Sequence, residues 1–290
     1  MGHAHHSSNM RRVIIALVLT GTFMIVEVIG GLLSGSLALL ADAGHMLTDT
    51  MALALAAVAF KVSKRPADTR LTYGYQRFQI LAAFVNGLSL LLIVGWILYE
   101  AIQRFITPEN VMGPTMLVVA SAGLVINIIA FVVLHGGDRE NLNIRGAALH
   151  VAGDLLGSVA AIVAAVIIIY TGWMQIDPIL SVAVAILILK SAWALVKRSA
   201  HVLLEGAPEW LDIEAMQRHL VDRIPEVVSI HHVHVWGMTP QHLMLTMHEQ
   251  IDPHPGNPTD VLRQVKEQRR EEYGIAHATI EIETVDCADH

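Results

Sequence analysis

The chain has 290 residues, of which 54% are hydrophobic and only 16% are charged. Soluble globular chains carry about 25% charged residues, so this composition excludes an ordinary soluble protein and favours a membrane protein. The formal net charge is −7, and the excess of acids lies in the C-terminal part, which argues against nucleic-acid binding.

Residues 1–12 form a polar segment that we predict to be a cytoplasmic N-terminal tail. Its start, "MGHAHHSSNM", fits either a disordered tail (or part of an affinity tag) or a weak metal-collecting segment. The apolar run that follows is too long for a signal peptide and lacks a small-residue cleavage pattern, so we expect it to be retained.

Six apolar runs follow, each longer than the roughly 18 residues that mark a candidate spanning helix. They cover residues 13–33, 36–60, 79–103, 114–135, 146–171 and 178–196. We therefore predict an all-α transmembrane domain of six helices at residues 13–206.

Lysine and arginine are distributed unevenly among the connections. Nine of them precede span 1 or lie between spans 2 and 3 or spans 4 and 5, whereas the other three connections hold only Arg104. The positive-inside rule then predicts a multi-pass protein of the cell inner membrane with both termini cytoplasmic. The nine are Arg11, Arg12, Lys61, Lys64, Arg65, Arg70, Arg77, Arg139 and Arg145.

The second and fifth runs share the motif H-x-x-x-D followed by small residues. "ADAGHMLTDTMALALAA" contains His45 and Asp49, and "ALHVAGDLLGSVAAIVAA" places His150 and Asp154 at the matching positions. Residues four apart point the same way on a helix. Because internal repeats place a transporter's binding site near the bilayer middle, we expect the two pairs to face each other.

Two facing pairs would supply two imidazoles and two carboxylates, a tetrahedral ligand set that zinc accepts. Magnesium and calcium prefer oxygen ligands, whereas cobalt, nickel and cadmium are not excluded by ligand type. The alternative is a structural role, but a charge at the bilayer centre costs at least about 2.5–3.5 kcal/mol, which favours function. Protons compete with the metal for these ligands, so proton-for-metal exchange follows from the ligand set.

Four further polar residues lie within or near the predicted spans. Asp42 and Asp177 lie nearer helix ends, where helix capping, support of a ligand and direct ligation are all open. Glu27 and Asn127 could line the ion path or make helix-packing hydrogen bonds.

The composition changes after Glu205, where Gly206 and Pro208 mark the start of a predicted cytosolic domain at residues 207–290. This part carries 15 Asp/Glu against 6 Lys/Arg, a net charge of −9, and nine of the sixteen histidines. Its only cysteine, Cys287, is also the only one in the chain, which excludes an intramolecular disulfide and agrees with a reducing cytosol.

The patterns in this domain predict the order helix, strand, strand, helix, strand, with an antiparallel sheet under two helices. This is an α+β fold of αββαβ type. The first helix should bury a stripe of apolar residues, and the second strand should bury one face while exposing the face that carries His242 and His248. The stripe is Leu211, Met216, Leu220 and Ile224, and the buried strand face is Leu243, Leu245, Met247 and Ile251.

The segments "GSLALLADAGHMLTDTMALALA", "ALHVAGDLLGSVAA" and "HHVHVW" together resemble the cation diffusion facilitator family, most closely its bacterial zinc/cobalt/cadmium-resistance branch. The resemblance covers essentially the whole chain. It implies six spans, a cytosolic ferredoxin-like domain, a homodimer, and export of Zn²⁺, or also Cd²⁺ and Co²⁺, in exchange for protons. It also implies that His45, Asp49, His150 and Asp154 form the transport site, with His45 favouring zinc because members with Asp there use a broader set of metals.

One departure concerns the loop between spans 2 and 3. Many members of the family carry a histidine there within a Y-G-H pattern, but this chain reads "LTYGYQRF", with Tyr75 at that position. The loop metal site of the family is therefore in doubt here, although Asp68 is present.

The histidines of the cytosolic domain suggest a second metal site. The resemblance implies that His231 and His248 bind regulatory zinc, with His232 and His234 as further candidates. A third ligand is expected near the C-terminus, from Asp286 or Glu283, with Cys287 and His290 also nearby. The alternative is that several of these are ordinary surface histidines. Bound zinc would screen the charge of −9 and let two such domains approach each other.

Two other functions compete with transport. An intramembrane metallohydrolase would also use His and Asp, but catalytic zinc keeps an open position beside three protein ligands, and the chain lacks H-E-x-x-H. A metal-gated sensor would leave the two ionisable pairs in the bilayer without a purpose. The sequence therefore predicts an ion-coupled transporter and not an enzyme, with zinc, protons and the lipid bilayer as partners.

Overall fold

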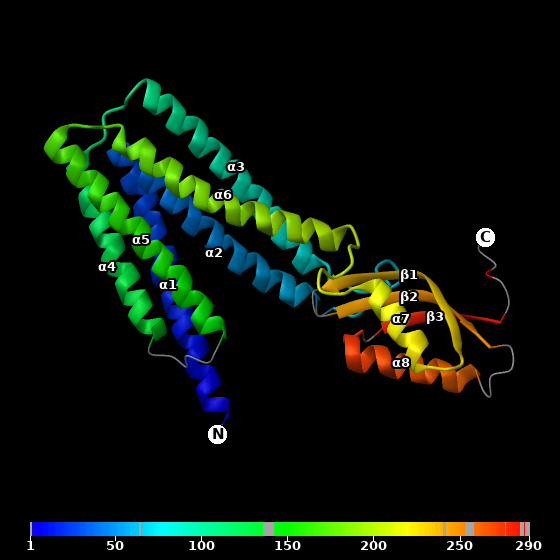
Figure 1. The fold of residues 1–290 in the computed structure, drawn as a ribbon. Coiled ribbons are helices and arrows are strands. Elements are labelled where there is room, and N and C mark those ends of the chain that lie inside the picture. The colour runs from blue at the N-terminus through cyan, green and yellow to red at the C-terminus, as the bar shows by residue number, and fades with distance from the viewer. Residues whose placement is uncertain are drawn as a thin grey trace. The chain divides into compact units, whose positions relative to one another are not determined.

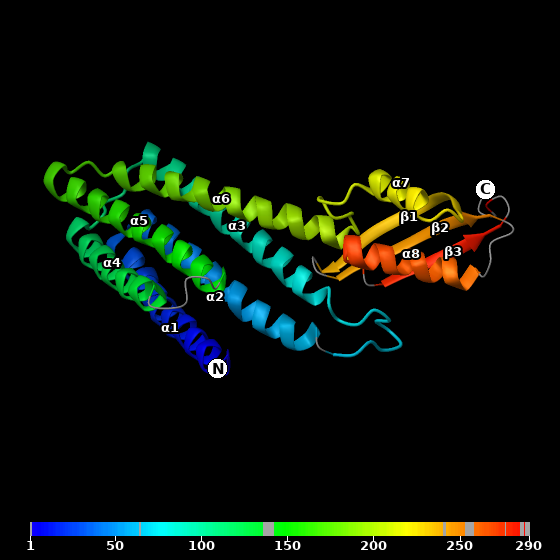
Figure 2. The same cartoon turned by 60° about the horizontal axis from the view of Figure 1, so that its bottom comes forward.

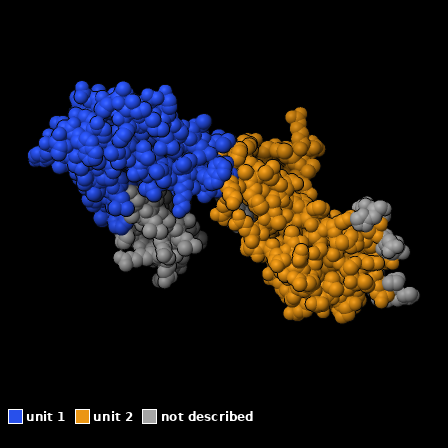
Figure 3. Space-filling model, turned by 45° about the horizontal axis from the view of Figure 1, so that its top comes forward, with its two compact units in different colours: residues 1–55, 85–196 blue, residues 56–84, 197–290 orange. Residues whose placement is uncertain are grey.

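The computed structural model describes residues 2–63, 65–135, 142–239, 242–252, 258–275, 277–284 and 287. Within the helices, the side chains of residues 2–14, 16–17, 48–49, 52–54, 56–57, 59–60, 63, 134–135, 142–153 and 258 are not described. The chain divides into two compact units. One comprises residues 1–55 and 85–196, and the other residues 56–84 and 197–290 (Figure 3).

Each predicted apolar run corresponds to one long helix. These helices are α1 (Gly2–Ser34), α2 (Leu37–Ser63), α3 (Phe78–Ile106), α4 (Gly113–His135), α5 (Leu142–Thr171) and α6 (Ile176–Leu203) (Figure 1). Among the described residues, four helices, α3 to α6, are long and apolar enough to cross a membrane, and α1 and α2 contribute the shorter apolar stretches Val18–Ser34 and Leu37–Leu47. Large apolar side chains point outward from these helices, as a lipid-facing surface requires; Leu92 is 76% exposed and Leu156 73%.

Small residues lie where the helices of the first unit meet. Helices α1, α4 and α5 pack together (Figure 2), and a Cβ added at Gly30 would come within 2.6 Å of Val119 on α4. The glycine therefore lets α1 approach α4 closely. Helices α2, α3 and α6 share a second core, where a Cβ at Gly87 would come within 2.7 Å of Val196.

The C-terminal domain has the predicted αββαβ order. It consists of α7 (Ile213–Arg223), β1 (Val227–Thr239), β2 (His242–Ile251), α8 (Pro258–Tyr273) and β3 (His277–Glu283). The sheet has the order β1-β2-β3, and β1 pairs with β2 in antiparallel fashion. The prediction of an antiparallel sheet is wrong for β3, which runs parallel to β2, because α8 crosses over between them and returns the chain in the same direction.

The buried face of this sheet is the predicted one. The four core residues of β2 pack with the apolar stripe of α7, with Val261 and Val265 of α8, and with partly buried Ala278, Ile280 and Ile282 of β3. The Asp212 carboxylate caps α7 by accepting a hydrogen bond of 3.0 Å from the Ala215 amide. Because side chains alternate along a strand, His231 and His248 lie on the other face of the sheet.

Candidate metal sites

The residues predicted to form the transport site are described only in part. His45 is half-buried on α2, and Asp154 on α5 is 4% exposed. The side chains of Asp49 and His150 lie outside the described residues. The structure therefore places one histidine and one carboxylate of the predicted four within the membrane helices.

Two more carboxylates accompany Asp154. Glu27 of α1 and Asp42 of α2 are almost fully buried and share a side-chain hydrogen bond, and Asp154 is close enough to interact electrostatically with both. A Cβ at Gly157 of α5 would lie 3.4 Å from Asp42 Oδ1, so the glycine makes room for that carboxylate. Acidic groups from α1, α2 and α5 thus meet inside the helical unit, and Asp42 contacts its neighbours there instead of capping its own helix.

Asp177 has a capping role. Its carboxylate lies in the first turn of α6 and accepts hydrogen bonds from Ser36 Oγ (2.6 Å), Leu37 N (2.7 Å) and Ala38 N (3.3 Å), at the start of α2. Asn127 donates to Ser158 Oγ at 3.3 Å across α4 and α5, which is the helix-packing alternative predicted for it. Both polar groups therefore connect helices.

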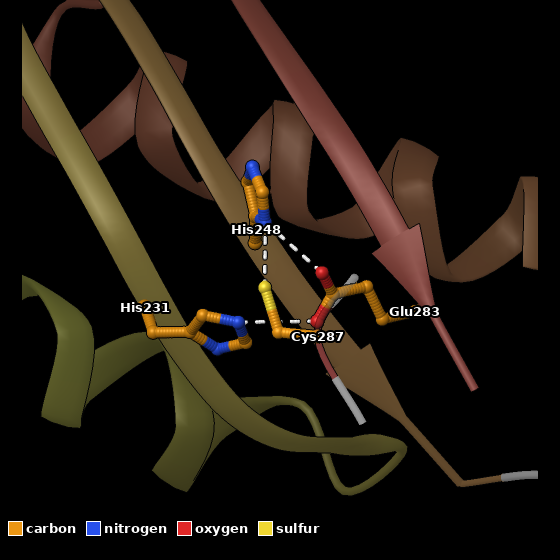
Figure 4. Close-up of side chains that lie close together, drawn as sticks. All are labelled: His231, His248, Glu283 and Cys287. Atoms are coloured by element: carbon orange, nitrogen blue, oxygen red, sulfur yellow. Dashed lines mark hydrogen bonds and ion pairs between the residues drawn. The ribbon is translucent and has the colours of Figure 1, made fainter. Parts of the chain in front are cut away.

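A cluster of four potential metal ligands lies on the face of the cytosolic sheet opposite its helices. Each of His231, His248, Glu283 and Cys287 offers one ligand atom, and these atoms lie within 4.8 Å of one another (Figure 4). His231 Nε2 lies 3.1 Å from Glu283 Oε2, and His248 Nδ1 lies 3.0 Å from Glu283 Oε1 and 3.5 Å from Cys287 Sγ. We call this group the cytosolic cluster.

Strand register explains how the cytosolic cluster forms. His231 and His248 are Cα partners across β1 and β2, and Glu283 of β3 pairs with Gln250, two residues beyond His248. The register of β1 shifts between His231 and His234, and His232 there has φ 48°, a strained value for a non-glycine residue. Cys287 reaches the cluster from the segment that follows β3 (Figure 4).

The neighbours of Glu283 in the cytosolic cluster stabilise its ionised form. Burial raises the pKa of the Glu283 carboxyl, but hydrogen bonds with Cys287 and His248 and the charges of His231 and His248 outweigh burial and lower it. Two imidazoles, a carboxylate and a thiolate form a tetrahedral N/O/S set of the kind that zinc accepts, so the residues present fit this metal.

The predicted members of this site differ in where they lie. His231 and His248 both belong to the cytosolic cluster. His232 does not belong to it, although its ring packs against His248 with the ring centroids 4.9 Å apart. His234 is exposed on β1 and is not part of the cytosolic cluster. Asp286 and His290 lie outside the described residues. Glu283, which the sequence offered with Asp286 as the third ligand, and Cys287, which it named only as lying nearby, complete the group.

Hydrogen bonds within the loop between α2 and α3 hold the Asp68 carboxylate. Asp68 accepts hydrogen bonds from Tyr75 Oη (2.8 Å), Arg70 N (2.8 Å) and Leu71 N (2.7 Å). The Leu71 amide, then Tyr75 and the Arg70 amide, lower the pKa of Asp68. Tyr75, which stands where many members of the family carry a histidine, thus donates a hydrogen bond to the Asp68 carboxylate.

Apolar helices with internal acidic groups, joined to an α+β domain with clustered histidines, define a metal-handling multi-pass membrane protein. Family profiles agree: the cation efflux transmembrane domain matches residues 13–204, and the cytoplasmic domain of cation efflux proteins matches residues 210–285. The chain belongs to the cation efflux, or cation diffusion facilitator, family, which is a family of transporters and not of enzymes.

Three relatives illustrate the similarity. The chain is 55% identical to zinc transporter ZitB of Pectobacterium atrosepticum, over 99% of this chain and 90% of the relative. It is 43% identical to the metal cation efflux system protein CzcD of Cupriavidus metallidurans, over 98% and 90%. It is also 43% identical to the cadmium, cobalt and zinc/H(+)-K(+) antiporter of Bacillus subtilis, over 98% and 92%.

Proposed function

We propose that the protein exports Zn²⁺ from the cytoplasm across the inner membrane in exchange for protons, with Cd²⁺ and Co²⁺ as further substrates. The observation that carries this proposal is membership of the cation efflux family across both domains. The names of the relatives, a zinc transporter and a zinc/H(+)-K(+) antiporter, support the metal and the exchange. The protein would act as a homodimer. Both of its termini would be cytoplasmic, an orientation that the distribution of Lys and Arg supports.

The proposed architecture follows the sequence. A tail at residues 1–12 precedes six spans within residues 13–206, with α1 and α2 crossing the bilayer like α3 to α6, and a cytosolic ferredoxin-like domain occupies residues 207–290. His45, Asp49, His150 and Asp154 would bind the transported ion. The burial of Asp154 between α1 and α2 supports this assignment.

Proton coupling follows from the chemistry of the ligands. Zinc binds neutral imidazole and ionised carboxylate, so protonation of the same atoms expels the metal and resets the site. Glu27 and Asp42 can share their hydrogen bond only while one of the two carboxyls carries a proton. This pair would hold a proton next to Asp154, where an exchanger needs one.

Reconstitution in liposomes tests the exchange. Zinc and lumenal pH are followed together, and zinc movement is expected to be accompanied by proton movement in the opposite direction. Asp154→Asn should abolish both, whereas Glu100→Gln, which removes a carboxylate from the Arg104 ion pair of α3, should preserve both. Zinc movement without proton movement would overturn the antiport, and transport by Asp154→Asn would remove Asp154 from the site.

The cytosolic cluster favours a second, regulatory metal site. His231, His248, Glu283 and Cys287 would bind cytosolic Zn²⁺, and the thiolate would add affinity for Cd²⁺. Cadmium titration of the full-length protein should produce an ultraviolet thiolate-to-cadmium charge-transfer band that Cys287→Ser removes. If the band is absent from the wild-type protein, Cys287 is not a ligand, whatever the outcome of the transport assay.

A further inference from the structure

The second unit contains a cavity whose lining residues include none of the proposed metal ligands. It has a volume of about 360 Å³ and is formed by the loop between α2 and α3 together with the first turns of α3, the last residues of α6 and the end of β1. Apolar and aromatic side chains supply most of its walls, among them Tyr73, Phe78, Leu81 and Leu203. Phe78 begins the spanning helix α3 and Leu203 ends α6, so the cavity lies at the cytoplasmic end of two spans.

Two arginines, Arg70 and Arg77, line the same cavity. Among the described residues Arg70 forms no ion pair. Arg77 donates through Nη1 to Glu205 at 3.0 Å, while its buried Nε and Nη2 atoms have no hydrogen-bond partner in the part of the chain that the structure describes. Buried donors without an acceptor are costly, so an anion that approached Arg77 would satisfy groups that the protein leaves unsatisfied.

The charges around the cavity favour an anion. Asp68 contributes one negative charge to this loop, and its carboxylate accepts three hydrogen bonds there. The described residues that line the cavity include two arginines and no acid, and the one acid that pairs with Arg77 is Glu205, just beyond the end of α6. Basic pockets on the cytoplasmic side of spanning helices suit anionic lipid headgroups.

We propose that this cavity binds the headgroup and upper acyl chains of an anionic phospholipid from the cytoplasmic leaflet. The phosphate lies against Arg70 and Arg77, and the acyl chains lie against Phe78, Leu81 and Leu203. The apolar walls and the position at the ends of the spans favour a lipid over a free phosphate. A second copy of the chain is a poor occupant, because its equivalent loop would bring the same positive charges. The proposal does not depend on the transport site.

Spin-labelled lipids test the proposal. The full-length protein is reconstituted without zinc, and the immobilised fraction of labelled phosphatidylglycerol is compared with that of labelled phosphatidylcholine. We expect the protein to hold phosphatidylglycerol preferentially, and Arg70→Gln to weaken that preference about fivefold. Arg77→Gln should weaken it similarly, and added salt should reduce it. Inorganic phosphate at millimolar concentration should not displace the lipid.

Matched variants separate anion binding from loss of an ion pair. Glu205→Gln and Arg77→Gln both break the same pair, but only the arginine variant should release the lipid. Arg263→Gln removes an exposed arginine from α8 and should leave lipid binding unchanged. Equal immobilisation of the two lipids, or full retention by Arg70→Gln and Arg77→Gln together, would overturn the proposal. Displacement of the lipid by inorganic phosphate would identify free phosphate as the occupant and overturn the proposal. Loss of the lipid whenever the protein dimerises would identify a second copy of the chain as the occupant and overturn it too.

Discussion

At the residue scale, the carboxylates of the helical unit have different tasks. Asp177 is fully buried and directs both oxygen atoms at the start of α2, where backbone amides would otherwise lack partners. Glu27, Asp42 and Asp154 instead meet one another between helices. The hydrogen bonds of Asp177 serve to hold α6 against the start of α2. A group of neighbouring acids such as Glu27, Asp42 and Asp154 can instead take up and release protons or a cation.

Asp177→Ala should destabilise the helical unit. The change removes the cap of α2 and leaves Ser36 Oγ and the Leu37 amide without their acceptor, a loss of about 1–3 kcal/mol. The thermal unfolding midpoint in detergent should fall. Ser191→Ala, which removes an exposed hydroxyl bonded only to the Leu187 carbonyl, is the control and should unfold like the wild type. Equal midpoints for the two variants would show that the cap contributes little.

His45→Asp should broaden metal use. Replacing a nitrogen ligand by oxygen weakens the preference for zinc among divalent ions, since imidazole suits zinc and carboxylates suit harder cations. The measurement is the ratio of manganese to zinc uptake by proteoliposomes at several metal concentrations. Ratios equal to those of the wild type would mean that His45 is not a selecting ligand. Met51→Leu, which alters an exposed side chain one to two turns further along α2, provides the control.

At the element scale, hydrogen bonds and a ring contact fix the loop between α2 and α3. The Tyr75 hydroxyl and two backbone amides hold Asp68, and Arg65 lies over the Tyr75 ring with its Cζ 6.0 Å from the ring centroid. The loop also reaches the cytosolic sheet, because the rings of Tyr73 and His277 make an edge-to-face contact. A loop fixed in this way can support the cavity that it lines.

Tyr75→Phe should make the loop more sensitive to acid. The pKa of Asp68 is lowered in the folded protein, so the stability that its carboxylate contributes is present above its unfolded pKa of about 3.9 and is lost as pH falls through the lower folded value. Removing the Tyr75 hydroxyl raises the folded pKa, and the loss then begins at higher pH.

Hydrogen exchange of the Arg70 and Leu71 amides measures this directly, since both donate to Asp68. After correction for the intrinsic rate, their protection should disappear at higher pH in Tyr75→Phe than in the wild type. Tyr73→Phe leaves the Asp68 bonds in place and should behave like the wild type. A common pH profile for all three proteins would show that the hydroxyl does not hold the loop.

Sequence periodicity was sufficient to predict the helices and strands, but not the contacts between residues far apart in the chain. Apolar runs gave all six helices, and alternation gave the strands and the buried face of β2. The parallel pairing of β3 was missed because it depends on the direction in which α8 returns the chain. The contact of Asp177 with Ser36, 141 residues away, and the approach of Cys287 to His248 depend on tertiary packing, which no local pattern encodes.

At the scale of the whole molecule, charge is divided between the parts of the chain. Residues 1–206 carry a net charge of +2, whereas residues 207–290 carry −9. Two copies of the acidic domain repel each other, and each Zn²⁺ bound in a cytosolic cluster reduces that repulsion. Metal concentration would therefore control how closely the domains of a homodimer approach, and by reciprocity their approach would tighten metal binding.

Zinc should bring the two cytosolic domains of the homodimer closer together. Fluorescent labels attached through an unnatural amino acid at position 263 on α8 avoid Cys287, and energy transfer between protomers should rise as micromolar zinc is added to the full-length protein. His231→Ala should abolish the rise because it removes a ligand, whereas His234→Ala, exposed on the same strand and outside the cytosolic cluster, should retain it. Moderate salt should raise the zinc-free transfer by screening the same charges. A zinc response that survives His231→Ala, or that His234→Ala removes equally, would separate domain approach from the cytosolic cluster.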